Sequence, residues 1–108
     1  MPTYNKLVRD GIPTIIAADG KTFHSRILDE QEYIKELRIK LREENEEYFA
    51  AESKEQALEE LADMLEVIHA LAVTHGSTPA DLEQLRVNKA NKRGGFSDRV
   101  FLIDVVEA

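Results

Sequence analysis

Apolar residues recur every three or four positions through most of the chain, the spacing that places them on one face of a helix. This pattern predicts three helices and a short helical turn, over residues 30–52, 54–75, 79–93 and 13–18. Two other stretches, 22–28 and 99–106, are rich in β-branched and aromatic residues, and we expect them to pair as a small two-stranded ribbon. The expected fold class is mainly α, an antiparallel helical bundle with this ribbon added.

Residues at the ends of these segments support the helix boundaries. Asp29 and Ser53 each precede a Glu or Gln by three positions, the arrangement of a capping box. Thr78 followed by proline is a further N-cap, with the proline at the first helical position. Gly76 and Gly94 stand where a helix ends in a left-handed residue. The sequence therefore predicts where each long helix begins and where the last two end.

Carboxylates interrupt the apolar faces of the first two long helices. Glu44 and Glu47 border the first apolar stripe, and Glu60 and Asp63 border the second; the two stripes are formed by Ile34, Leu37, Leu41 and Tyr48, and by Leu61, Met64, Leu65, Ile68 and Leu71. Packing of these faces would bring four carboxylates together, which is costly unless they are protonated, paired with Lys or Arg, or bridged by a hard cation. Oxygen ligands favour Mg²⁺ or Mn²⁺.

An alternative exists for each acidic pair, because glutamates on a solvated helix surface are common. The coincidence of two pairs at the same spacing on two helices, each intruding on an apolar face, favours a metal site over that alternative.

Charge and composition limit the classes of function. The 108 residues include no Cys, which excludes disulfides and thiolate ligands, and they carry a formal charge of −7, which argues against a nucleic acid polymer or an anionic membrane as partner. No apolar run is long enough for a signal peptide or a membrane span. We expect one domain over 1–108, located in the cytoplasm.

The third long helix changes from apolar to cationic along one line, where Leu82 and Leu85 are followed by Lys89, Lys92 and Arg93. Basic residues in a last turn complement the helix dipole, which alone is enough to account for them. The alternative is that these cations bind phosphate opposite the acidic cluster. Two N-terminal cations, Lys6 and Arg9, are further candidates for phosphate binding.

These motifs together resemble the all-α nucleoside triphosphate pyrophosphohydrolases, the MazG-like and phosphoribosyl-ATP pyrophosphohydrolase-like superfamily. Its EExxE and ExxD motifs match residues 43–47 and 60–63. The opening stretch 4–13, YNKLVRDGIP, and the closing stretch 92–96, KRGGF, resemble the small single-domain branch of predicted house-cleaning enzymes. The resemblance therefore covers nearly the whole chain.

The resemblance implies Mg²⁺-dependent cleavage between the α and β phosphates of a nucleoside triphosphate, which yields a nucleoside monophosphate and pyrophosphate. The implied roles are metal ligation by Glu44, Glu47, Glu60 and Asp63, water positioning by Glu43, and phosphate binding by Lys89, Lys92 and Arg93. It also implies a homodimer or a dimer of dimers. Two alternatives stay open: a phosphoribosyl-ATP pyrophosphohydrolase of histidine synthesis, and a non-catalytic metal-binding helical interaction module.

Overall fold

The computed structural model describes residues 2–107 and is mainly helical, with no strand in that range. Four helices follow one another: α1 (Ile12–Ala18), α2 (Glu30–Ala50), α3 (Lys54–Thr74) and α4 (Pro79–Arg93). The predicted helices are confirmed, with ends that differ by at most two residues. Within the described residues, no helix has both the length and the apolar character needed to cross a bilayer.

The predicted N-caps are present at all three long helices. Asp29, Ser53 and Thr78 each accept a hydrogen bond from the backbone N–H three residues later, at 2.8–3.1 Å. These bonds satisfy N–H groups that have no partner within a helix. After α3 and α4 the chain turns at Gly76 and Gly94, which have φ of 77° and 82°. This left-handed conformation costs glycine little because it has no Cβ.

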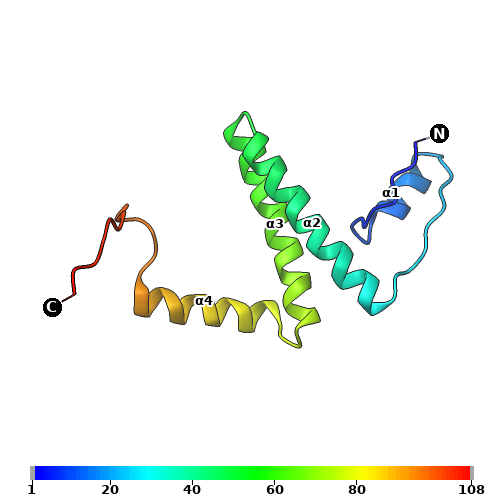
Figure 1. Cartoon of the computed structure of the whole chain (residues 1–108). Helices are drawn as coiled ribbons and strands as arrows, with labels where there is room; N and C mark the ends of the chain where they lie inside the picture. Colours follow the sequence, from blue (N-terminus) through cyan, green and yellow to red (C-terminus); the bar gives the residue numbers. More distant parts are fainter. Residues whose placement is uncertain (1, 108) are drawn as a thin grey trace.

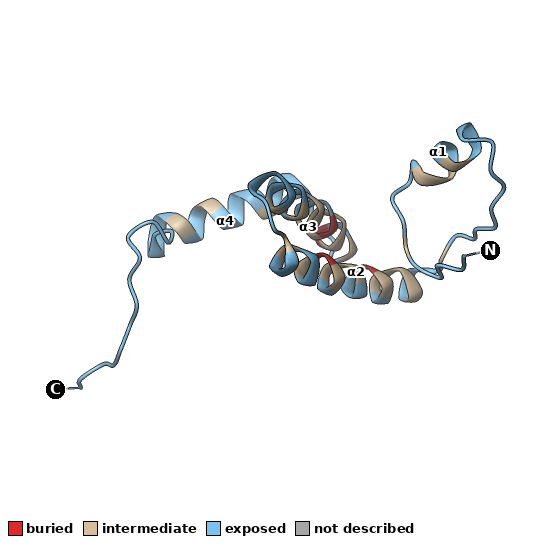
Figure 2. Cartoon of the chain, turned by 90° about the horizontal axis from the view of Figure 1, so that it is seen from above, coloured by how far each residue is buried: buried red, intermediate tan, exposed pale blue. Residues whose placement is uncertain are grey.

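α2 and α3 form an antiparallel hairpin, while α4 leaves the base of that hairpin at a wide angle (Figure 1). Within the described chain, α4 contacts α3 but not α2. The buried apolar residues, Leu37 on α2 and Val67 and Ala72 on α3, all lie in the hairpin (Figure 2). The hairpin therefore contains the apolar core of one chain, and α4 adds little to it.

The two segments expected to pair as a β ribbon do not pair within the chain. Residues 22–28 and 99–106 lie outside any helix or strand, at opposite ends of the molecule (Figure 1). The prediction is therefore wrong for a single chain. The two segments do not meet because α4 points away from the hairpin and carries the C-terminal segment away from the N-terminal half (Figure 1).

The single chain is much more open than a compact domain of the same length. Its radius of gyration is 18.7 Å, whereas about 13 Å is usual for a chain of this size. Its accessible surface is 9,962 Å², whereas a folded monomer of this mass exposes about 6,100 Å². Many large apolar side chains, including Leu58 and Leu65 of α3, are more than half exposed.

Candidate metal centre

Three carboxylates from two helices converge on one side of the α2–α3 hairpin. Glu44 and Glu47 of α2 and Glu60 of α3 each offer an oxygen, and these oxygens lie within 4.8 Å of one another. We call these three residues the carboxylate cluster. The two glutamates of α2 share a face because they are three residues apart, and the packing of α3 on that face supplies the third. Three of the four predicted ligands are thus brought together.

The carboxylate cluster contains oxygens that are removed from water without receiving a hydrogen bond. Glu44 is 6% exposed and is the only buried charged residue among those described. One oxygen of Glu44 and one of Glu60, the Oε2 atom in each, are buried and have no hydrogen-bond partner in the described protein. Such atoms are rare in native proteins and call for a specific partner, such as a proton or a cation.

Burial and mutual repulsion raise the pKa of two members of the carboxylate cluster. Removal from water is the larger cause for Glu60, and the neighbouring Glu44 and Glu47 add to it, so that the pKa of Glu60 rises to about 7. Burial likewise raises the pKa of Glu44 above its ordinary value. Without a cation, the carboxylate cluster therefore retains a proton at pH values where an ordinary glutamate is fully ionised.

The fourth predicted ligand, Asp63, lies outside the carboxylate cluster and contacts a cation instead. Its Oδ1 accepts a hydrogen bond of 2.6 Å from Nη2 of Arg9. Both side chains are partly exposed. Arg9, a predicted phosphate-binding residue, thus lies beside the acidic site, and its present partner is a carboxylate of α3.

Two lysines lie close to Glu43 and Glu44. The Nζ atoms of Lys6 and Lys40 lie 3.8 and 3.9 Å from the carboxylate of Glu43, and Lys40 is also 3.6 Å from Oε1 of Glu44. Lys6 was predicted to be near phosphate, whereas Lys40 was missed by the sequence interpretation. Its spacing of three and four residues from two glutamates on one helix was the available signal.

The basic end of α4 is remote from the carboxylate cluster of the same chain. Lys89, Lys92 and Arg93 follow the part of α4 that packs on α3, and they lie toward the free end of the helix (Figure 1). The carboxylate cluster lies nearer the opposite end of the hairpin, where α2 is joined to α3. A single chain therefore does not place these three cations opposite the acidic site.

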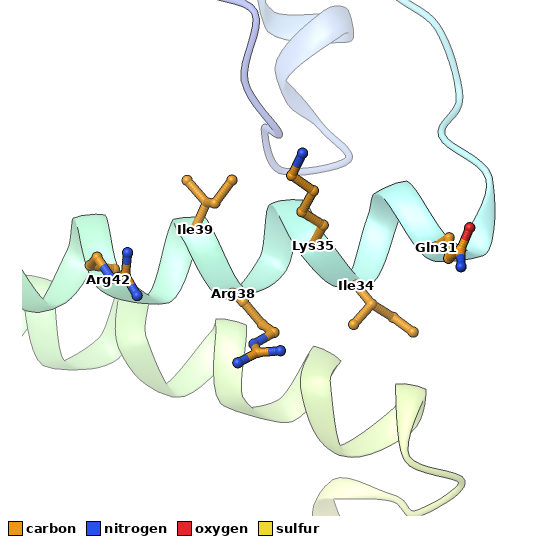
Figure 3. Close-up of a pocket in the computed structure, with 6 residues that line it drawn as sticks. All are labelled: Gln31, Ile34, Lys35, Arg38, Ile39 and Arg42. Carbon is orange, nitrogen blue, oxygen red and sulfur yellow. The ribbon is translucent and has the colours of Figure 1, made fainter.

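Two hollows of the surface lie away from the carboxylate cluster. One, of about 410 Å³, runs along α2, where Lys35, Arg38 and Arg42 alternate with isoleucines (Figure 3). The other, of about 280 Å³, lies between α3 and α4 and is lined by apolar residues such as Ile68 and Leu82. Neither is lined by a residue of the carboxylate cluster, so the carboxylate cluster of a single chain is not part of either hollow.

The geometry of the carboxylate cluster fits a hard divalent cation. Its donors are all carboxylate oxygens, two of which are buried without a partner. A bound cation would supply the missing interaction and would favour the ionised form of all three glutamates. With Lys6, Lys40 and Arg9 around it, the site combines negative groups for a metal with positive groups for an anion.

Comparison with known proteins gives one relative. Over 54 residues the chain is 46% identical to an uncharacterized protein of Mycolicibacterium smegmatis. The match covers half of this chain and 55% of that protein. No protein-family profile matches the chain, and no solved structure matches it.

Proposed function

We propose that this protein is a Mg²⁺-dependent nucleoside triphosphate pyrophosphohydrolase of the MazG-like, all-α type, with Mn²⁺ as an alternative ion. It would cleave the bond between the α and β phosphates and release a nucleoside monophosphate and pyrophosphate. The role is the removal of unwanted nucleotides from the cellular pool. The observation that carries the proposal is the convergence of Glu44, Glu47 and Glu60, with buried oxygens that lack a partner.

In this proposal the carboxylate cluster holds the metal ion, and Asp63 joins it as a fourth ligand. When bound, Mg²⁺ neutralises phosphate charge and makes a water molecule more acidic. Asp63 needs only to exchange its contact with Arg9, which is a partly exposed pair. Arg9 would then be released to bind a phosphate oxygen with its planar guanidinium.

The surrounding side chains supply the remaining roles. Glu43 positions the attacking water and accepts its proton, while the ammonium groups of Lys6 and Lys40 hold Glu43 in place. Lys6, like Arg9, would bind phosphate. Placed around the leaving pyrophosphate, these cations stabilise the charge that develops on it.

The proposed assembly is a homodimer or a dimer of dimers in which the helices of several copies complete an antiparallel bundle. Two observations support it: the excess exposed surface of one chain and the remoteness of its α4 cations from its own carboxylate cluster. A second copy would cover the exposed apolar faces of α3. It would also supply Lys89, Lys92 and Arg93 to the neighbouring acidic site.

The test is a pyrophosphate-release assay over normal and modified nucleoside triphosphates and phosphoribosyl-ATP, with and without Mg²⁺. Glu60→Gln and Asp63→Asn should each reduce Mg²⁺-stimulated release by at least about 100-fold, because they remove charge from the metal site. Glu59→Gln is the matched control, since Glu59 is an exposed neighbour outside the carboxylate cluster. Circular dichroism should show equal helicity in all variants.

Two results would overturn the proposal. One is full turnover in both Glu60→Gln and Asp63→Asn. The other is the absence of Mg²⁺-stimulated pyrophosphate release from every nucleotide, which would favour a metal-binding interaction module.

A further inference from the structure

The C-terminal segment exposes an unusual density of large apolar side chains. Seven of them within residues 96–106 are each 72–97% exposed: Phe96, Val100, Phe101, Leu102, Ile103, Val105 and Val106. Contiguous apolar surface of this kind marks an interaction site in most proteins. Residues 99–107 lie outside any helix or strand and are exposed.

The segment before α2 has the same properties. Residues 22–28 lie outside any helix or strand, and Phe23 and Ile27 are 42% and 96% exposed. Among the described residues, neither 22–27 nor 100–107 makes a backbone hydrogen bond with the rest of the protein. Both segments therefore have the unpaired N–H and C=O groups of a free strand edge, and such edges pair readily with another strand.

The residue patterns of the two segments are complementary. Along an extended chain, Phe101, Ile103 and Val105 lie on one face, as do Phe23 and Ile27 in the other segment. Each remaining face carries one charge, a cation at Arg26 in the first segment and an acid at Asp104 in the second. An antiparallel register that sets Ile27 opposite Ile103 pairs residues 24–28 with residues 102–106. It also sets Arg26, whose guanidinium contacts Glu32 within its own chain, opposite Asp104.

Within one chain these segments are held apart, because one precedes the α2–α3 hairpin and the other follows the outward-pointing α4 (Figures 1 and 2). A twofold axis between two copies removes this obstacle. A contact made across such an axis occurs twice, so each C-terminal segment could meet the N-terminal segment of the other copy.

We propose that a strand within residues 100–106 of one copy pairs in an antiparallel way with a strand within residues 22–28 of a second copy, and that the reciprocal ribbon forms at the other end of the dimer. The available surface is sufficient for such an assembly. One chain exposes about 3,900 Å² more than a compact monomer of its mass. Stable homodimers bury about 1,000–2,500 Å² per partner. The argument for the ribbon uses only residues of the two segments and none of the carboxylate cluster. It is therefore independent of the proposed enzymatic function.

Disulfide cross-linking can test the ribbon directly, because the natural chain contains no cysteine. Ile27→Cys and Ile103→Cys are made as separate proteins, mixed, incubated to exchange subunits and oxidised. Opposed residues of an antiparallel pair have Cα atoms about 4.5–5.5 Å apart, which is within reach of a disulfide. We expect a covalent dimer in the mixture and little in either protein alone. Both isoleucines are largely exposed, so the substitutions should leave folding intact.

Leu102→Cys is the matched control, because residue 102 faces the opposite side of the same strand. Phe101→Cys and Val105→Cys, which share the face of Ile103, cover registers shifted by two residues. The yield of covalent dimer is measured for each of these proteins mixed with Ile27→Cys. A yield at position 101, 103 or 105 that is at least about tenfold higher than the yield with Leu102→Cys supports the ribbon.

A chain that carries both Ile27→Cys and Ile103→Cys separates the two topologies. We expect oxidation to give a covalent dimer, seen by denaturing mass analysis. A monomer with an internal disulfide would overturn the proposal, and so would the absence of cross-links in every pairing. Both results stand whether or not the protein releases pyrophosphate, so failure of the ribbon is distinguishable from failure of the proposed function.

Discussion

At the scale of single residues, the main feature is a group of carboxylates held where water cannot solvate all of them. Glu44 is buried at the α2–α3 contact, and Glu60 faces it with one buried oxygen. Folding therefore forces like charges together, and the result is a raised pKa at both residues. Glutamates in this arrangement hold a proton at a higher pH than exposed glutamates do.

The pH dependence of metal-free stability tests this interpretation. The pKa of Glu60 is about 7 in the folded chain against an ordinary value of 4.5, so the folded state binds more protons than the unfolded state between these values. The free energy of unfolding should therefore decrease as pH rises from about 4.5 to about 7 in the presence of a chelator. Urea denaturation at a series of pH values and constant ionic strength measures this free energy of unfolding. Glu60→Gln should flatten the slope, whereas Glu59→Gln should keep it; an unchanged slope in Glu60→Gln would contradict the assignment.

Arg9 allows a second prediction at this scale. Its contact with Asp63 is partly exposed, so Arg9→Ala should change the free energy of unfolding by less than about 1 kcal/mol. Under the proposed function the same variant should raise KM for the nucleotide, because a phosphate-binding cation is lost. Steady-state kinetics and thermal denaturation measure the two effects. Arg38→Ala, in a hollow of α2 away from the carboxylate cluster, is the control and should leave KM unchanged.

At the scale of elements, the α2–α3 hairpin positions the site. Three residues separate the two helices, and the N-cap of α3 lies at the end of that connection. The cap sets the start of α3 and hence the turn of the helix on which Glu60 stands. Stability of this end of the hairpin therefore depends on the hydrogen bond that Ser53 accepts.

Ser53→Ala should reduce the free energy of unfolding by about 1 kcal/mol, because the backbone N–H of Gln56 loses its acceptor. Chemical denaturation followed by circular dichroism measures the change. Ser25→Ala, at an exposed position in the extended segment before α2, is the matched control and should lie within about 0.5 kcal/mol of the natural chain. Equal stability of the two variants would show that the cap does not contribute as argued.

At the scale of the whole molecule, one chain leaves too much apolar surface uncovered. The apolar core of the hairpin is small, α4 packs on α3 alone, and the C-terminal segment touches little. Small domains are stable only when they bury most of their apolar surface. We therefore expect other copies of the chain to cover the apolar surface that one chain leaves exposed.

Sedimentation at micromolar concentration should therefore give at least twice the chain mass of 12.3 kDa. The thermal midpoint should rise with protein concentration, because subunit association stabilises the folded state by mass action. A monomer with a concentration-independent midpoint would contradict both expectations. The measurement needs neither metal nor nucleotide.

Particular residues show how far sequence reasoning reached. The caps at Asp29, Ser53 and Thr78 were predictable because a helix end has local requirements that one side chain satisfies. The inward position of Glu44 was predictable from helical periodicity. The contact of Asp63 with Arg9 was not, since it joins residues 54 positions apart through a partly exposed ion pair. The contacts of Lys40 with Glu43 and Glu44 follow from its spacing of three and four residues on the same helix.

The sequence by itself determined the helices, their N-caps and the faces on which the carboxylates stand, because these depend on interactions between residues a few positions apart. Only the tertiary structure decided which carboxylates meet, that Asp63 contacts Arg9, and that α4 carries its cations and the C-terminal segment away from the hairpin. Those features depend on how helices pack and on the angle at which one helix leaves another. Residues distant in sequence set that angle together, so no local pattern encodes it.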